Sequence, residues 1–168
     1  GEPQSCEFRM VRKDGSELWV QWAATVSTTV DGSPELRAVF SDITARKVAE
    51  QALRESGEHY HSLFTSIDEG FCIIEMIFDA HGAPVDYRFL ELNPSFEKQS
   101  GLHHAAGKRI REIVPNLETH WFEIYGKVAL TGEPVRLVEE TRELDGRWFD
   151  VHASRLGGPE SRKVAIVF

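Results

Sequence analysis

Hydrophobic and polar residues alternate along several short segments of the chain, and this period of two predicts β-strands. The clearest case runs from Val20 to Val26, where every second residue is apolar and falls on one face. Asp-Gly pairs and other turn residues separate neighbouring segments, as in β-hairpins. The strands predicted in this way are 7–12, 19–26, 36–43, 70–78, 85–92, 135–141, 148–156 and 163–168.

Between these segments the pattern favours helices. Over 44–66 only Gly57 disfavours a helix, and the Thr44 hydroxyl is placed to accept a backbone N–H of the first turn. Further helices are predicted over 95–101, 107–114 and 121–130. The second half of the chain therefore has two strands, several helices and three strands, without β-α-β alternation. This order predicts an α+β domain, in which an antiparallel sheet carries short helices on one face.

One strand-and-turn signature occurs twice. Asp14-Gly15 and Asp145-Gly146 each stand between two predicted strands, and 145 − 14 places them 131 residues apart, about one domain length. The repeat indicates tandem domains, of which the first copy lacks its front half. We expect 1–43 to be the C-terminal strands of a first domain, 44–66 a linker helix and 67–168 a second domain. The whole is then an excised piece of a longer polypeptide.

The composition argues against several classes of function. The net charge of −8 argues against nucleic-acid binding, which needs a basic face. No apolar run approaches the roughly 20 residues that span a bilayer, so we expect no direct membrane contact in this piece; a membrane anchor elsewhere in the parent protein is compatible with this. Cys6 and Cys72 have no CxxC spacing, which predicts neither a disulfide framework nor a metal site and fits the reducing cytoplasm.

Several motifs, in their order along the chain, resemble those of PAS domains. They are Lys13-Asp14-Gly15-Ser16, Asp42-Ile43-Thr44, Gly70, Asn93-Pro94-Ser95-Phe96, Gly101, Gly107-Lys108 and Thr131-Gly132-Glu133. The resemblance covers nearly the whole chain. It implies that 67–168 is a complete PAS fold with a five-stranded antiparallel sheet and short helices on one face. A linker helix and a three-strand remnant of another PAS domain (its PAC region) would precede it.

The strand-to-helix junction at 42–46 is the first candidate site. Asp42 can pair with Arg46 four residues later, while Thr44 caps the helix. This describes an ordinary junction between a strand and a helix. The resemblance implies more, namely that Asp42, Ile43, Thr44 and Arg46 form the exit motif through which a PAS core passes a signal to the following helix.

The second candidate site is a pocket between the sheet and the helices, which the resemblance implies and which apolar ligand sites generally favour. Its candidate walls are Cys72, Ile74, Met76, Trp121, Tyr125, Phe149 and Val151. The alternative is that these residues simply pack the core. A haem would need an axial ligand, for which His120 is a weak candidate. A flavin photosensor would need a cysteine within 98–110, where there is none, so we expect neither haem nor flavin.

The chain shows no motif of an enzyme. Gly157-Gly158-Pro159 is a turn rather than a phosphate-binding loop, and no pair of histidines has zinc-protease spacing. His59 and His61 lie on the linker helix, but without the phosphoacceptor sequence of histidine kinases. We expect no catalytic activity in this piece and no metal site.

The resemblance implies a sensory or relay module of a bacterial signal-transduction protein, first of all a two-component sensor histidine kinase, a transferase. Such a module binds a small ligand or a partner and passes the change through its flanking helices. We expect a homodimer formed through the linker helix and the outer sheet face. Two alternatives stay open: a ligand-free dimerisation module, or the PAS part of a cyclic-dinucleotide cyclase or phosphodiesterase.

Overall fold

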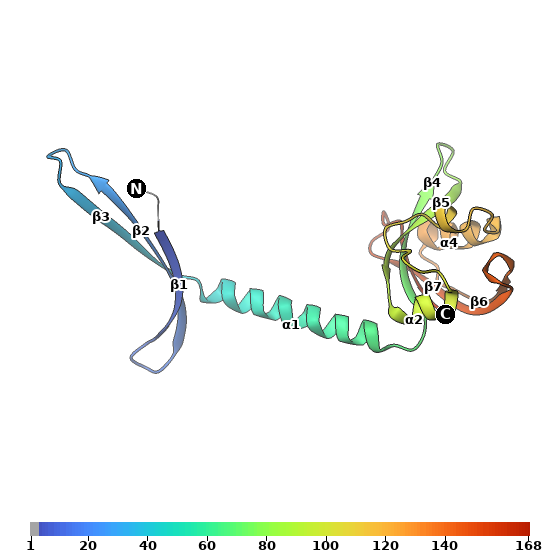
Figure 1. Ribbon diagram of the computed structural model, residues 1–168, viewed down its shortest axis with the longest axis horizontal. Coiled ribbons are helices and arrows are strands. Elements are labelled where there is room, and N and C mark those ends of the chain that lie inside the picture. Colours follow the sequence, from blue (N-terminus) through green and yellow to red (C-terminus); the bar gives the residue numbers. More distant parts are fainter. Residues whose placement is uncertain (1–3) are drawn as a thin grey trace. The chain divides into compact units, whose positions relative to one another are not determined.

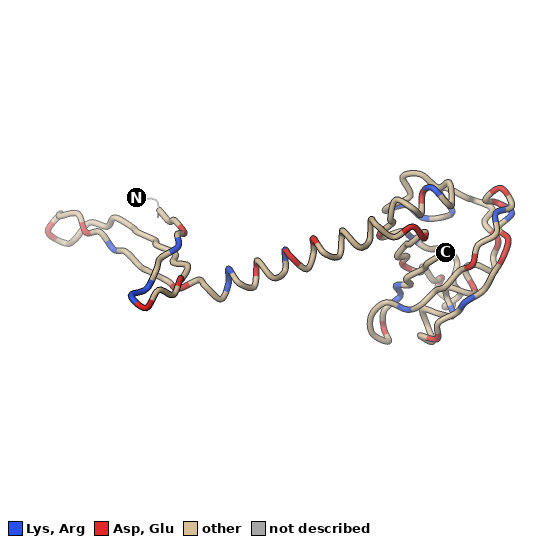
Figure 2. Tube along the Cα trace, turned by 90° about the horizontal axis from the view of Figure 1, so that it is seen from below, with Lys and Arg blue, Asp and Glu red and all other residues tan. Residues whose placement is uncertain are grey.

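The computed structural model describes residues 4–168, and the chain divides into two compact units, Gly1–Tyr60 and His61–Phe168 (Figure 1). The long helix α1, Thr44–Ser66, begins in the first unit and ends in the second. Basic and acidic residues interleave along α1 and through the second unit rather than gathering in separate stretches (Figure 2). None of the helices within residues 4–168 has both the length and the apolar character that crossing a membrane requires.

The first unit is an antiparallel sheet in the order β1-β2-β3. Its strands are β1 Gln4–Val11, β2 Glu17–Thr28 and β3 Pro34–Asp42. Among the apolar side chains that the structure describes in this unit, only Val20, Ala24 and Ile43 are buried, whereas Val39 and Phe40 are exposed. A three-stranded sheet with so little buried surface gains little from the hydrophobic effect.

The second unit is a five-stranded antiparallel sheet in the order β5-β4-β8-β7-β6. Its elements are β4 Phe71–Phe78, β5 Pro84–Leu92, α2 Pro94–Ser100, α3 Ile110–Ile113, α4 Thr119–Thr131, β6 Val135–Thr141, the 3₁₀ turn η1 Arg142–Leu144, β7 Arg147–Leu156 and β8 Lys163–Val167. The helices cover one face of the sheet (Figure 1). The predicted α+β class, the five-stranded antiparallel sheet and the short helices on one face are confirmed.

The core lies between this face of the sheet and the helices. Ile74 and Phe122 are fully enclosed there, and Val164 and Ala153 continue the same layer on the neighbouring strands. On β4 the opposite face is also partly covered, because the Phe71 ring packs edge-on against Phe64 at 5.4 Å between centroids. The near-continuous apolar sequence of β4 reflects this two-sided burial.

Two sequence predictions differ from the observed fold. The helix predicted over 107–114 is only the single turn α3, because the residues before it pair with a strand: Phe89 donates to the Lys108 carbonyl at 3.0 Å, and Gly107 donates to the Phe89 carbonyl at 2.8 Å. The turn η1 was not predicted. Its C-cap is Asp145, whose φ of 58° is left-handed, a conformation that Asp tolerates better than most residues.

Two helical glycines provide a test of the packing between α4 and the sheet. A Cβ on Gly126 would lie 2.6 Å from Pro84 Cβ, whereas a Cβ on Gly57 in α1 would meet nothing. We expect Gly126→Ala to lower the free energy of unfolding by about 1–3 kcal/mol through overpacking. Gly57→Ala should raise helix stability by about 0.5–1 kcal/mol. Urea unfolding followed by circular dichroism checks both, and an unchanged or raised stability of Gly126→Ala would contradict the close approach.

Candidate functional site

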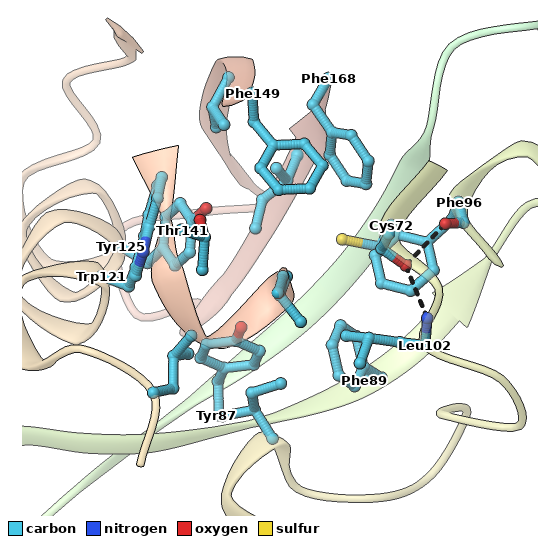
Figure 3. A pocket seen from close by; sticks show the side chains of 16 residues that line it. Cys72, Tyr87, Phe89, Phe96, Leu102, Trp121, Tyr125, Thr141, Phe149 and Phe168 are labelled. Carbon is cyan, nitrogen blue, oxygen red and sulfur yellow. Dashed lines mark hydrogen bonds between the residues drawn. The ribbon is translucent and has the colours of Figure 1, made fainter. Parts of the chain in front are cut away.

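A cavity of about 60 Å³ lies between the helix-covered face of the sheet and the helices of the second unit. Figure 3 shows its walls: Trp121 and Tyr125 come from α4, Cys72 from β4, and Phe149 from β7. The Cys72 sulfur and the Tyr87 hydroxyl point towards the space at the centre. The cavity is therefore built from sheet and helix side chains together.

Five of the predicted wall residues line this cavity: Cys72, Trp121, Tyr125, Phe149 and Val151. The other two, Ile74 and Met76, are buried in the core but do not line it. They share a face of β4 with Cys72 but lie nearer the strand end that packs tightly under Gly126 of α4. Alternation along a strand identifies the inward face, but it does not tell where along that face the packing opens.

Further wall residues were not identified from the sequence. Tyr87 and Phe89 come from β5, where residues two positions apart share a face of the strand. Phe96 belongs to the Asn93-Pro94-Ser95-Phe96 motif. The 3₁₀ turn η1 brings Leu144 to the wall without any periodic signal in the sequence.

The aromatic wall residues contact one another edge-on in a continuous series. The centroid distances are 5.4 Å for Tyr87–Phe89, 5.3 Å for Phe89–Phe96, 5.5 Å for Phe96–Phe168 and 5.0 Å for Phe149–Phe168. Such edge-to-face pairs stabilise by roughly 0.5–1.5 kcal/mol beyond the area they bury. Displacing one ring therefore affects its neighbours in the series.

The polar groups of the wall are neutral. Ser100 Oγ donates to the Phe96 carbonyl at 2.7 Å and accepts from the Leu102 N–H at 3.1 Å. Burial raises the pKa of the Cys72 thiol and of the Tyr87 and Tyr125 hydroxyls well above their usual ranges. The Cys72 thiol is thus held protonated and unreactive at neutral pH.

His120, the weak candidate for an axial ligand, does not line the cavity. Its Nε2 lies 2.9 Å from Glu139 Oε2, and its ring packs 5.0 Å from the Trp121 ring. The side chain therefore takes part in a surface contact between α4 and β6. Within residues 4–168, no three His, Cys, Asp or Glu side chains gather in an arrangement that could hold a metal ion.

The junction at 42–46 differs from the prediction in its pairing. Asp42 Oδ1 accepts the Thr44 N–H at 2.9 Å, so Asp42 rather than Thr44 caps the first turn. The Thr44 hydroxyl instead accepts the Trp19 N–H at 2.9 Å, which ties the helix start to β2. Hydrogen bonding to Thr44 lowers the pKa of Asp42. Ile43, which belongs to the same predicted motif, is buried.

Arg46 pairs with Glu7 of β1 and not with Asp42. Arg46 Nη2 lies 2.6 Å from Glu7 Oε1, and Lys47 Nζ lies 2.6 Å from Glu7 Oε2. The two cations, Lys47 first, lower the pKa of the Glu7 carboxyl. The predicted Asp42–Arg46 pair is wrong because Asp42 already accepts from Thr44 and contacts Arg12 at 3.3 Å.

No family model matches the chain, and no curated protein matches it. Solved structures do. A PAS domain of an HTR-like protein from Haloarcula marismortui is 18% identical, with 72% of this chain and 96% of that chain covered and a TM-score of 0.49. A LOV protein from Rhodobacter sphaeroides is 16% identical, with 67% and 65% covered and a TM-score of 0.46. A domain of a sensory box sensor histidine kinase/response regulator from Geobacter sulfurreducens is 20% identical, with 68% and 95% covered and a TM-score of 0.41.

The second unit has the architecture that the PAS resemblance predicts. The strand count, the antiparallel pairing and the helices on one face all agree, and we call it the PAS-like unit below.

The buried tyrosines predict a specific pH dependence. Because burial raises the pKa of Tyr87 and Tyr125 above the ordinary value of 10.0, the unfolded chain loses these protons at lower pH than the folded chain does. Stability is then fully present below pH 10 and falls as the pH rises above it. A titration at 295 nm, with and without urea, should show tyrosine ionisation that stays incomplete above pH 10 until unfolding. Complete ionisation of the folded chain near pH 10 would contradict this.

Proposed function

We propose that this chain is the sensory or relay module of a bacterial multidomain signalling protein, first of all a cytoplasmic sensor histidine kinase. The PAS-like unit binds a small molecule in its cavity and passes the change to its flanking helices. One observation carries the proposal: an aromatic-walled space lies between the sheet and the helices of a unit that is otherwise closely packed. Spaces of this kind, with few polar groups, are the usual ligand sites of proteins.

A physical connection joins this cavity to the end of α1. Residues 67–69 link α1 to β4, and their carbonyls accept hydrogen bonds from α2 and its cap. Ser95 Oγ donates to the Ile67 carbonyl at 2.8 Å, and Gln99 Nε2 donates to the Asp68 carbonyl at 2.6 Å. The same helix supplies Phe96 and Ser100 to the cavity wall. A ligand that moves α2 therefore acts directly on the segment where α1 ends.

Exposed apolar side chains support self-association as part of the proposal. On the sheet face away from the helices, Trp148 is 69% exposed and Val138 is 60% exposed. On α1, Val48 and Leu53 are exposed as well. Large exposed apolar groups of this kind mark association surfaces, and a second copy of the chain is the partner we propose for them.

The small size of the cavity favours a second function. A volume of about 60 Å³ is well below the roughly 150 Å³ of an apolar cavity that holds benzene. A PAS-like unit whose space holds only water would serve as a dimerisation module that aligns helices without sensing a ligand.

Native mass spectrometry of the purified chain distinguishes the two functions. We expect a dimer that carries extra mass, and this mass should be lost on denaturation. A dimer at the bare polypeptide mass would contradict ligand sensing and favour the dimerisation module.

The two cysteines offer matched variants for this experiment. Cys72→Leu places a larger side chain in the cavity and should abolish the extra mass. Cys6→Leu changes an exposed residue of β1 and should leave the extra mass in place. If the extra mass persists in Cys72→Leu, the bound molecule does not occupy this cavity.

A further inference from the structure

Three buried side-chain atoms at the start of α4 have no hydrogen-bond partner among residues 4–168. They are Glu118 Oε2, His120 Nε2 and Trp121 Nε1. Native proteins satisfy most buried polar groups, because water does not replace a missing partner there. Three exceptions within the segment 118–121 require a physical explanation, and the titratable imidazole among them supplies one.

The contact that His120 makes depends on its charge. Its Nε2 lies 2.9 Å from Glu139 Oε2, but the ring nitrogen is not oriented to form a hydrogen bond with that oxygen. A neutral imidazole therefore gains little from Glu139, and with a lone pair on Nε2 two acceptors face each other. A charged imidazole is attracted to the carboxylate whatever the direction of its N–H. The contact between α4 and β6 is thus favourable in the protonated form.

The charges around His120 are mostly negative. A surface groove brings His120 together with charged groups from the cap of α4, from β6 and from η1, which are Glu118, Glu139, Glu140 and Arg142. On α4 itself Glu123 follows three residues later, and from β7 the groove receives the uncharged Trp148. Glu140, Arg142 and Glu123 are exposed, so water screens them most. Glu139 is therefore the main partner of the imidazolium.

The polar contacts of the first turn of α4 lead to β6 and η1. Glu118 is the N-cap residue, but its side chain makes no capping hydrogen bond to the helix. Its Oε1 instead accepts the Arg142 N–H of η1 at 2.8 Å. The His120–Glu139 contact is the neighbouring connection, between α4 and β6. A change in the charge of His120 therefore acts where the start of α4 meets the end of β6.

We propose that His120 and Glu139 form a pH-sensitive switch, in which the imidazolium holds the first turn of α4 against β6 and loss of its proton releases that turn. Histidine ordinarily changes its charge between about pH 5 and 8. The contact is therefore made at the acidic end of this range and lost as the pH rises. The switch goes beyond the proposed small-molecule function, because its input is a proton and neither residue lines the cavity.

A double-mutant cycle on the full chain measures the switch. The variants are His120→Gln, Glu139→Gln and the two combined, each unfolded in urea at about pH 5.5 and about pH 8, where carboxylates are mostly ionised but imidazoles are mostly charged only at the lower pH. The two side chains are 39% and 44% exposed, so water weakens their attraction. We expect a stabilising coupling of about two- to fivefold in the unfolding equilibrium constant at the lower pH, and none at the higher.

The backbone amide of Arg142 reports whether the turn moves. Its N–H donates to Glu118 Oε1, so its NMR chemical shift should change as His120 titrates. Both His120→Gln and Glu139→Gln should remove this pH dependence. His81→Gln is the matched control, because His81 lies in the exposed turn between β4 and β5 and its substitution should leave the pH dependence in place.

Two results would overturn the switch. A coupling that is absent at both pH values, or equal at both, would show that the charge of His120 does not govern the contact. A pH-dependent Arg142 shift that persists in Glu139→Gln would show that the imidazole acts on this amide without drawing α4 to β6. The mass of a bound molecule has no bearing on either result, so the switch and the small-molecule function can fail independently.

Discussion

The Asn93 side chain fixes three segments of the PAS-like unit to one another by hydrogen bonds, and the position of α2 depends on these bonds. It is 1% exposed, and its Oδ1 accepts the N–H of Phe71 at 2.9 Å and that of Phe96 at 2.8 Å. Its Nδ2 donates to the Glu69 carbonyl at 2.9 Å. One amide thus joins the segment after α1, the first strand of the sheet and the N-terminus of α2. Leaving any of these buried backbone groups without a partner costs roughly 1–3 kcal/mol, so the position of α2 over the sheet is tightly specified.

The position of α2 over the sheet determines where a cavity can form in the PAS-like unit. At one end of the sheet α4 comes close to β5 over Gly126, and no room remains beneath it. At the other end the first turns of α4 share the cover with α2 and α3, which have only seven and four residues. Short helices bury fewer side chains than long ones, and the aromatic rings that span the gap pack against each other at their edges. Both the cavity and its connection to α1 therefore depend on the short helix α2, which covers this end of the sheet.

The sequence pattern predicted the elements better than the pairings. Alternation along β4 and β7 identified Cys72 and Val151 as inward-facing, and both line the cavity. The same alternation could not separate Ile74 from Cys72, because the difference arises from how close α4 lies at each position. At the junction before α1, spacing suggested that Arg46 pairs with Asp42 four residues before it. The residue that it contacts, Glu7, is 39 positions away, and only the folded β1 brings it there.

We expect occupancy of the cavity to affect α1 through α2 and the segment 67–69. Hydrogen exchange of the backbone amides from Ile67 to Phe71, measured on the full chain and on its Cys72→Leu variant, whose larger side chain occupies the cavity, tests this expectation most directly. These amides include Phe71 N–H, which Asn93 accepts, and Ile67 N–H, which bonds to the Leu63 carbonyl at 3.2 Å in the last turn of α1. Their exchange rates should change when the cavity is occupied, while those of the exposed β1–β2 hairpin should not. A change confined to the residues of the cavity wall would contradict it.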